Sequence, residues 1–177
     1  SNAYNAAGNV TGTTIYPVSG SERITTSVSY TSDQAFVAST TDATGGVTQY
    51  DYDRLTGLLS YVVNANGSRT TYLYDPCGRL TSLFADTDGD GTADTGEAAV
   101  QYTYTSGRLT AIVTASGSYT LTYDAYGNLT AIYVGSQETP LAAYTYAANN
   151  GKLLRTDYAD GTYAENFYDT LDRLEEV

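Results

Sequence analysis

Acidic residues recur at fixed spacing in one glycine-rich stretch, residues 86–97. Carboxylates stand at its positions one, three, five, nine and twelve, a glycine at position six permits a sharp turn, and position seven can offer its backbone carbonyl. Carboxylates this close repel one another unless a hard cation neutralises them, and calcium prefers such oxygen ligands. The pattern therefore predicts a calcium site whose ligands are Asp86, Asp88, Asp90, Thr92, Asp94 and Glu97.

The residues around this stretch limit the likeness to known calcium loops. The spacing resembles the loop of an EF-hand, but residues 80–85 and 98–104 are predicted to be strands, so the paired helices of an EF-hand are missing. Position eight is Ala93, where a larger aliphatic residue would normally anchor the loop. The alternative interpretation is a solvated turn of Asp and Gly that holds no metal.

Few other residues offer catalytic chemistry. The chain has no histidine, so Cys–His and Ser–His arrangements for nucleophilic catalysis cannot form. Aspartate and glutamate are plentiful enough for a carboxylate-pair hydrolase, but their spacing selects no pair. The single cysteine, Cys77, excludes an internal disulfide and a cysteine-rich metal site. We therefore predict a protein that is not an enzyme.

Composition and charge limit the classes of partner that this protein is expected to bind. The chain of 177 residues has a formal net charge of −12, which argues against nucleic acid as a partner because phosphates would repel it. No apolar run is long enough to cross a membrane, so no membrane insertion is predicted for this sequence. The 19 tyrosines and the absence of Trp and Met favour strands over helices. Low Lys and abundant Thr, Ser, Asn and Tyr are compatible with secretion.

A repeat of about 22 residues organises most of the chain. Its anchors are Tyr30, Tyr52, Tyr74, Tyr104, Tyr123, Tyr146 and Tyr168. Each anchor is followed by an apolar residue of a return strand: Phe36, Leu59, Leu80, Leu109, Leu129, Leu153 and Leu174. Turn-forming pairs such as Asn66-Gly67 and Asp160-Gly161 separate the units. About seven units, each of two strands and two turns, predict roughly fourteen short antiparallel strands.

Residues 72–81 are the clearest copy of this unit. Tyr72 and Tyr74 fall on one face of a strand, because side chains alternate along it. Asp75 to Gly78 then suits a type I turn, in which Asp accepts backbone hydrogen bonds, Pro presets φ and Gly tolerates the fourth position.

The recurring pattern Tyr-x-Tyr-Asp-x-x-Gly-Arg-Leu-Thr resembles the YD-repeat (Rhs) family over residues 28–177. Residues 72–81 are close to its consensus, residues 102–110 lack the Asp, and residues 144–154 lack both Asp and Arg. The resemblance implies a fragment of a large secreted or surface-attached bacterial protein. Its repeats would wind a β-sheet into a hollow shell, which in some members encloses a C-terminal toxin domain. Other members are linked with carbohydrate binding or adhesion.

A related Asp-Pro motif marks autoproteolytic cleavage in some members of that family. Here Asp75-Pro76 stands in the middle of the array, and Arg79-Leu80 continues the ordinary repeat. We therefore interpret residues 75–78 as a turn, with Cys77 as an exposed free thiol at its tip.

The predicted fold class is all-β: an antiparallel meander of about seven hairpin repeats forming a curved open sheet or partial barrel, similar to an Rhs shell. Residues 1–3 resemble a remnant of tag removal. Residues 4–27, punctuated by Gly8, Gly12, Pro17 and Gly20, are predicted to be a degenerate repeat or an edge strand. Residues 28–177 are the repeat array, with the acidic insertion at 86–97.

The tyrosines allow two interpretations. Alternating tyrosines on successive strands favour a packed cross-strand ladder for the repeat anchors. Aromatic rings with a polar hydroxyl also suit sugars, and Tyr119, Tyr126 and Tyr133 are the predicted contact points for that role. Arg79, Arg108 and Arg173 are expected to pair with carboxylates of turns or neighbouring strands.

These observations predict a structural scaffold of a secreted or bacterial cell-surface protein, with neighbouring repeats as its partners and calcium stabilising the insertion. Two alternatives stay open. One is a module that binds a glycan or a host receptor through exposed tyrosines, and the other is part of a shell around a C-terminal toxin domain.

Overall fold

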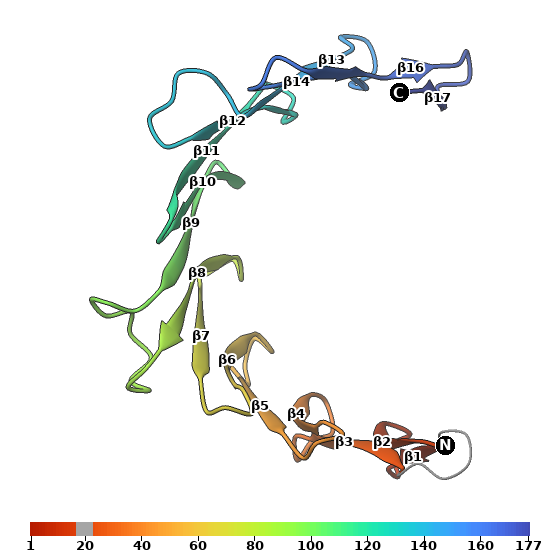
Figure 1. The fold of residues 1–177 in the computed structure, drawn as a ribbon, viewed down its shortest axis with the longest axis vertical. Coiled ribbons are helices and arrows are strands. Elements are labelled where there is room, and N and C mark those ends of the chain that lie inside the picture. Colours follow the sequence, from red (N-terminus) through yellow and green to blue (C-terminus); the bar gives the residue numbers. More distant parts are fainter. Residues whose placement is uncertain (17–22) are drawn as a thin grey trace. The chain divides into compact units, whose positions relative to one another are not determined.

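The computed structural model describes residues 1–16 and 23–177, and these consist of β-strands and the turns between them (Figure 1). They form two compact units, Ser1–Ala99 and Val100–Val177. The predicted all-β class is confirmed. Pro17 and Gly20, two of the predicted punctuating residues, lie outside the described residues.

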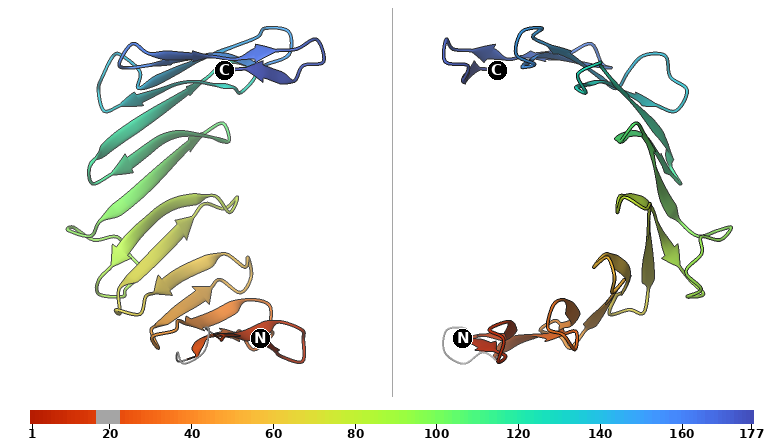
Figure 2. Two further views of the ribbon diagram at one scale, coloured as in Figure 1. Left: turned by 45° about the vertical axis from the view of Figure 1, so that its right-hand side comes forward. Right: turned by 180° about the vertical axis from the view of Figure 1, so that it is seen from behind.

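Within each unit, consecutive strands pair antiparallel in the order of the chain (Figure 2), except that the last two strands, Phe167–Tyr168 and Leu174–Glu176, pair only with each other and form a separate two-stranded sheet. The first unit contains β1 (Asn2–Tyr4), β2 (Val10–Ile15), β3 (Ile24–Tyr30), β4 (Val37–Thr41), β5 (Val47–Tyr52), β6 (Leu59–Val63), β7 (Arg69–Tyr74) and β8 (Leu80–Asp86). The second contains β9 (Ala99–Thr105), which begins at the boundary, β10 (Arg108–Thr114), β11 (Gly117–Tyr123), β12 (Leu129–Val134), β13 (Ala142–Tyr146), β14 (Leu153–Tyr158), β15 (Tyr163–Glu165), β16 (Phe167–Tyr168) and β17 (Leu174–Glu176). Among the described residues β1 pairs with β2 alone, so the sheet is open.

The seven predicted hairpins are all present: β3–β4, β5–β6, β7–β8, β9–β10, β11–β12, β13–β14 and β16–β17. The described residues form seventeen strands rather than roughly fourteen, for two reasons. Strands β1 and β2 add a hairpin at the N-terminus. The last outgoing strand is split into β15 and β16 at Asn166, whose N–H donates to the carbonyl of Leu154 (2.8 Å).

The N-terminal hairpin follows the same pattern as the others. Tyr4 takes the anchor position, and Asn5 replaces the usual aspartate, accepting on Oδ1 the N–H groups of Ala7 (3.0 Å) and Asn9 (2.9 Å). Residues 2 and 3, predicted to be a remnant of tag removal, pair with β2. The origin of those residues and the extent of the degenerate repeat over 4–27 stay predictions.

Every hairpin carries a β-bulge beside its anchor tyrosine. In β7–β8, Tyr74 lies opposite Leu80 while Leu73 lies opposite Ser82, so Thr81 has no ladder partner. The Thr81 hydroxyl donates instead to the carbonyl of Leu73 (3.1 Å). A bulge at the same point of every unit increases the local twist each time.

Hydroxyl groups of five anchor tyrosines join a hairpin to the one before it. Five such bonds have their donor on the anchor and their acceptor on a return-strand carbonyl: Tyr30 to Val10 (2.8 Å), Tyr74 to Leu59 (3.0 Å), Tyr123 to Leu109 (2.7 Å), Tyr146 to Leu129 (2.9 Å) and Tyr168 to Leu153 (2.9 Å). The anchor rings are half-buried, as cross-strand packing predicts. Burial raises the pKa of the Tyr74 and Tyr146 phenols.

The turn at residues 75–78 has the predicted geometry. The N–H of Gly78, which has a φ of +78°, donates to the carbonyl of Asp75 (2.9 Å). Asp75 Oδ1 accepts the N–H groups of Cys77 and Arg79, and Asp75 Oδ2 pairs with the Arg79 guanidinium (2.6 Å). Donation from the Arg79 backbone and side chain lowers the pKa of Asp75.

The predicted arginine pairing is confirmed for Arg79 and for Arg173, which pairs with Asp169 (2.7 Å). It is wrong for Arg108, which has no ion pair among the described residues. Thr105 stands where Arg79 and Arg173 find their aspartate, so the Arg108 guanidinium lies over the Tyr123 ring (5.8 Å to its centroid) and against Gly127.

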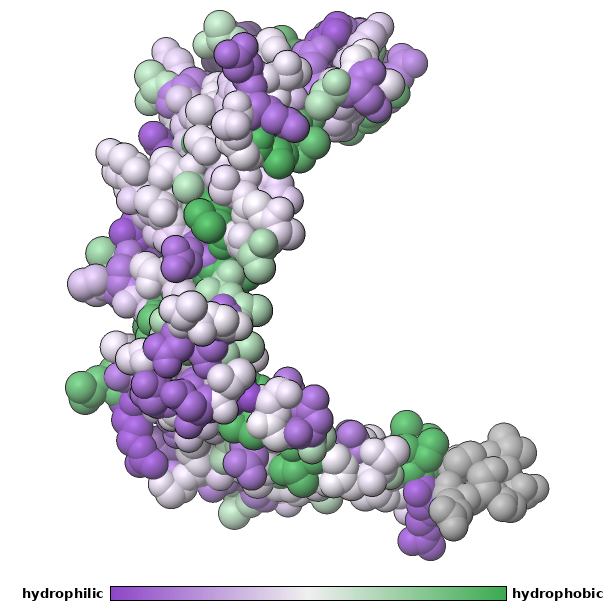
Figure 3. Space-filling view, turned by 60° about the vertical axis from the view of Figure 1, so that its left-hand side comes forward, coloured by the Kyte–Doolittle hydropathy of each residue, from purple (hydrophilic) through white to green (hydrophobic). Residues whose placement is uncertain are grey.

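Burial is shallow in both units. Among the described apolar residues only Phe84, Ala131 and Ala142 are less than a tenth exposed. Figure 3 shows hydrophobic residues as separate green spots among polar and intermediate ones. The ladder and the contacts between neighbouring hairpins therefore hold each unit, rather than a thick core.

Candidate metal centre

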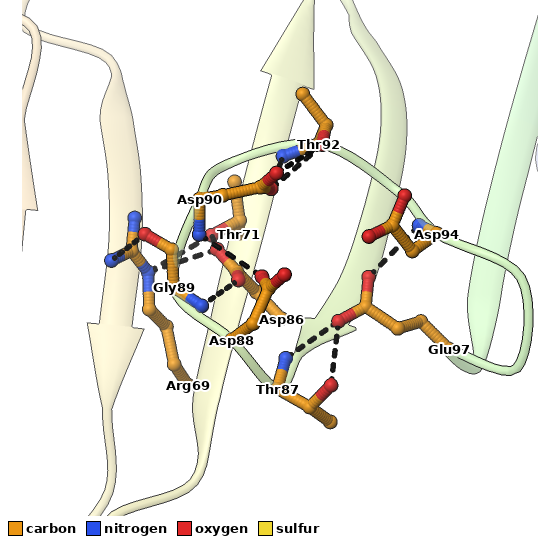
Figure 4. A network of polar contacts seen from close by, with 10 residues as sticks. All are labelled: Arg69, Thr71, Asp86, Thr87, Asp88, Gly89, Asp90, Thr92, Asp94 and Glu97. Carbon is orange, nitrogen blue, oxygen red and sulfur yellow. Dashed lines mark hydrogen bonds and ion pairs between the residues drawn. The ribbon is translucent and has the colours of Figure 1, made fainter.

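The acidic stretch forms the loop between β8 and β9 (Figure 4). The N–H of Ala85 donates to the carbonyl of Ala98 (3.0 Å), which closes the base of the loop. Strands lie on both sides, as predicted. The loop is thus held by a strand ladder instead of the helices that flank an EF-hand loop.

The first residue of the loop, Asp86, is fixed by strand β7. Its side chain is fully buried, and its Oδ2 lies 3.0 Å from Arg69 Nε and accepts the Thr71 hydroxyl at 2.7 Å. Its Oδ1 accepts the N–H of Gly89 (2.7 Å). Because Arg69 and Asp86 are direct partners in the β7–β8 ladder, the guanidinium neutralises a carboxylate that would otherwise be buried without a counter-charge.

Arg69 also contacts the body of the loop. Its Nη1 donates to the carbonyl of Gly89 (3.0 Å), and its guanidinium lies over the Tyr61 ring (4.0 Å to its centroid). One side chain therefore links two strands to the start of the loop.

The five predicted carboxylates converge in two overlapping groups. Ligand atoms of Asp86, Asp88 and Glu97 lie within 4.8 Å of one another, and so do those of Asp88, Asp90 and Asp94. Asp88 belongs to both groups. Four of the five residues are exposed or half-buried, so a cation could reach them from solvent.

Hydrogen bonds inside the loop orient these carboxylates. Asp90 accepts the backbone N–H and the hydroxyl of Thr92, both at 2.7 Å. Glu97 reaches back across the loop to the N–H groups of Thr87 (2.6 Å) and Asp94 (3.1 Å). Gly91 has a φ of +83°, which is the sharp turn expected at position six.

Two opposing effects act on the acidity of the loop. Repulsion from Asp90, together with desolvation and the other loop carboxylates, raises the pKa of Asp94. Hydrogen bonds from Thr92 lower the pKa of Asp90, and those from Thr87 and Asp94 lower the pKa of Glu97. Asp94 is the residue whose charge a bound cation would relieve most.

The ligand atoms of the loop are of the kind that calcium binds, but one oxygen of Asp86 is already taken by other partners. Carboxylate oxygens at this spacing are the ligands that calcium prefers. Asp86, however, has Oδ2 committed to Arg69 and Thr71, which leaves Oδ1 as its oxygen on the loop side. Thr92 contacts Asp90 through its hydroxyl, and its predicted role as a carbonyl ligand stays a prediction.

Arg69 and Thr71 were not predicted from the sequence as parts of this site. A signal for Arg69 exists, because counting outward from the turn at 75–78 and allowing one bulged residue places Arg69 opposite Asp86. The predicted peripheral tyrosines differ from one another: Tyr126 is 88% exposed, whereas Tyr119 and Tyr133 are half-buried. Cys77 is an exposed free thiol, as predicted.

Residues 55–93 and 102–139 match the family model described as RHS Repeat. Two segments of the chain are therefore similar to RHS repeats. The predicted YD-repeat (Rhs) resemblance is thereby confirmed, and the first matched segment runs from the turn after β5 into the acidic loop.

Solved structures share the fold. The crystal structure of TcdB2-TccC3-TEV matches with a TM-score of 0.64 at 15% identity, covering 98% of this chain and 10% of that chain. The crystal structure of TcdB2-TccC3 without hypervariable C-terminal region matches with a TM-score of 0.54 at 15% identity, covering 98% of this chain and 12% of that chain. The chain therefore spans about a tenth of the length of these neighbours.

A comparison with curated proteins gave no match. In the part of the chain that the structure describes, no helix has the length and apolar character needed to span a membrane.

Proposed function

We propose that these RHS repeats form one segment of a β-sheet wall in a secreted or cell-surface protein that is not an enzyme. The observation that carries this proposal is the recurring hydrogen bond from an anchor tyrosine to the return strand of the preceding hairpin. Such a bond connects a hairpin only to the neighbouring hairpin, so further hairpins can be added to the array without changing those already present. Shallow burial supports the same role, because no single hairpin has a core of its own.

The wall is proposed to enclose a C-terminal toxin domain in the intact protein. Support comes from the fold shared with TcdB2-TccC3, a protein with a hypervariable C-terminal region. The test is limited proteolysis of the protein expressed from the full open reading frame. We expect its C-terminal domain to resist protease until the repeats unfold in urea. Cleavage at the same rate with and without the repeats would contradict enclosure.

Calcium is proposed to stabilise the loop at residues 86–97. Its support is the convergence of five carboxylates on a base fixed by Arg69. A ligand that binds only the folded state stabilises it by about 2.7 kcal/mol at a concentration one hundred times its dissociation constant. We expect calorimetry to detect calcium binding and the melting temperature to fall when a chelator is added.

Asp88→Asn is the sharpest variant for this test, since Asp88 belongs to both carboxylate groups. The matched control is Asp51→Asn, an exposed position on β5 that removes the same charge. Binding heat should disappear in the first variant and persist in the second. The calcium proposal would be wrong if calorimetry detected no binding heat with millimolar calcium and the melting temperature did not change when a chelator was added.

A second candidate function is glycan binding in the second unit. A groove of about 450 Å³ lies between two turns, and its lining combines the rings of Tyr126 and Tyr146 with the polar side chains of Asp124, Asn128 and Asn149. An exposed aromatic face beside amides and a carboxylate suits a neutral sugar. A glycan array should then show hits that Tyr126→Ala abolishes; an array without hits would leave only the scaffold.

A further inference from the structure

The turn at residues 64–68, which joins β6 to β7, contains the pair Asn66-Gly67, and all of its residues are exposed. Gly67, with a φ of +85°, donates its N–H to the carbonyl of Asn64 (2.8 Å), and the N–H of Asn64 donates to the carbonyl of Ser68 (2.9 Å). The glycine thus supplies the positive φ that this tight hairpin needs. Asparagine is also one of the thermolabile residues of proteins, and the surroundings of its side chain decide how readily it reacts.

The side-chain amide of Asn66 is open to attack by the backbone nitrogen that follows it. Its Oδ1 accepts the N–H of Ser68 (3.0 Å), which polarises the Cγ carbonyl and stabilises the negative charge that an attacking nucleophile places on the oxygen. Its Nδ2 makes no hydrogen bond within the described part of the chain, so no protein group holds the amide nitrogen. Glycine hinders the approach least, and no atom lies within 4 Å of the place that a Cβ of Gly67 would take.

These groups can react with each other without an enzyme. The Gly67 nitrogen loses its proton to solvent and bonds to Cγ of Asn66, the Cγ–Nδ2 bond breaks, and ammonia leaves behind a succinimide ring. Water then adds to one of the ring carbonyls and opens the ring to aspartate or isoaspartate. Ring closure requires Asn66 to rotate, which breaks the bond from Gly67 to the carbonyl of Asn64. An exposed turn can open locally in this way without unfolding of the strands that it joins.

The other Asn-Gly pair of the chain, Asn150-Gly151, is held more firmly. Its Oδ1 accepts the N–H of Lys152 (3.2 Å), much as in Asn66, but its Nδ2 also donates to Asp172 Oδ1 (3.4 Å). Asp172 is fixed in turn by its ion pair with Lys152 (2.8 Å). Ring closure at Asn150 therefore has to break a side-chain hydrogen bond that Asn66 lacks.

We propose that Asn66 is the preferred site of spontaneous deamidation in this protein, with the backbone nitrogen of Gly67 as nucleophile and water as the only other reactant. The turn borders a groove of about 300 Å³ that Arg69 and Asp86 also line, so the reaction places a new carboxylate near the ion pair at the base of the acidic loop. Isoaspartate also adds one carbon to the backbone of the turn, which disturbs its hydrogen bonds. The inference is independent of the proposed wall, calcium site and glycan groove.

Mass spectrometry of aged protein tests the proposal. Folded wild type is incubated at mildly alkaline pH and digested under mildly acidic conditions, so that digestion itself adds no deamidation. Fragment spectra then quantify conversion at each asparagine, and labelling by isoaspartyl methyltransferase identifies isoaspartate. We expect conversion at Asn66 and roughly fivefold slower conversion at Asn150, the factor that one additional hydrogen bond contributes. In urea both pairs should convert at the same rate, because no structure distinguishes them.

Two variants of the same turn complete the test. Asn66→Gln keeps an amide but needs a larger ring that closes slowly, so conversion at residue 66 should disappear. The matched control is Asn64→Gln, also exposed but followed by Ala65, and it should leave conversion at Asn66 unchanged. An Asn66 that stays intact in the folded protein while the protein in urea converts overturns the proposal, because the turn then protects the amide. Conversion of Asn150 as fast as Asn66 in the folded protein overturns it as well.

Discussion

Replacing Tyr74 by Phe tests the hydrogen bond that joins neighbouring hairpins. The change removes one hydroxyl and leaves the ring, so it deletes the 3.0 Å bond to the carbonyl of Leu59 and little else. A neutral hydrogen bond of this kind contributes about 1 kcal/mol net to stability. Leu59 is half-buried, so water can reach its vacated carbonyl in part. We therefore expect a loss of about 1 kcal/mol rather than the roughly 3 kcal/mol of a fully buried, unpaired carbonyl.

The assay is urea unfolding followed by circular dichroism. The matched control is Tyr72→Phe, on the same face of β7, because the Tyr72 hydroxyl makes no hydrogen bond within the described residues. We expect the control to change the free energy of unfolding by less than about 0.5 kcal/mol. Combining Tyr74→Phe with Tyr146→Phe, whose partners lie in the other unit, should cost about 2 kcal/mol, since distant changes add.

Alkaline pH gives an independent check on the same phenol. Burial raises the pKa of Tyr74 above its usual value of 10.0, so the folded state keeps the proton after the unfolded state has lost it. Its contribution to stability is complete below pH 10.0 and is lost as the pH rises through the folded-state pKa. The advantage of wild type over Tyr74→Phe should shrink there. Equal stability of Tyr74→Phe and Tyr72→Phe at neutral pH would refute the reasoning.

Three further predictions concern the turns and the loop. Gly78→Ala should cost about 1 kcal/mol in chemical denaturation, because a φ of +78° strains any residue with a Cβ while the added methyl would meet Leu58 only at 3.7 Å. Asp75→Asn should reduce the acid sensitivity of the protein. Hydrogen bonds lower the pKa of Asp75 below 3.8, so its contribution to folding stability is present above that pH and is lost as the pH falls through the folded-state pKa. A series of melting temperatures measured at different pH values would show this difference between wild type and variant. Arg69→Ala should cost about 3 kcal/mol because it leaves Asp86 buried without its counter-charge, and combining it with Asp86→Asn should recover part of that loss in a double-mutant cycle.

The hairpins were predictable from the sequence because their signals are local. Tyrosine at alternating positions, Asp at the first turn position and Gly at the fourth each act through backbone geometry within a few residues. The N-terminal segment was predicted only as a degenerate repeat or an edge strand, because Asn5 replaces the aspartate and Val10 replaces the leucine, although Asn makes the same hydrogen bonds. The carboxylate groups of the loop were predictable from spacing alone.

Contacts between hairpins were harder to predict. The Tyr74 hydroxyl finds Leu59 only because a bulge shifts the register of each hairpin, and register depends on pairing across the ladder rather than on composition. Arg69 illustrates the same limit. Its importance for Asp86 depends on the bulged register of β7–β8, which places two residues far apart in the chain directly opposite each other.

The acidic insertion shows why an array of this kind tolerates irregular units. The hairpin before the insertion keeps its bulge at Tyr74, and the hairpin after it keeps the corresponding bulge beside Tyr104. The unit that lacks an aspartate at Thr105 adapts in a similar way, since Arg108 shifts to Tyr123 and Gly127 and the next anchor still donates to Leu109. Each hairpin contacts only its neighbouring hairpins, so the structural effect of a substitution or an inserted loop stays within one repeat. The acidic loop at residues 86–97 can therefore be inserted between two hairpins without changing the turns of either hairpin.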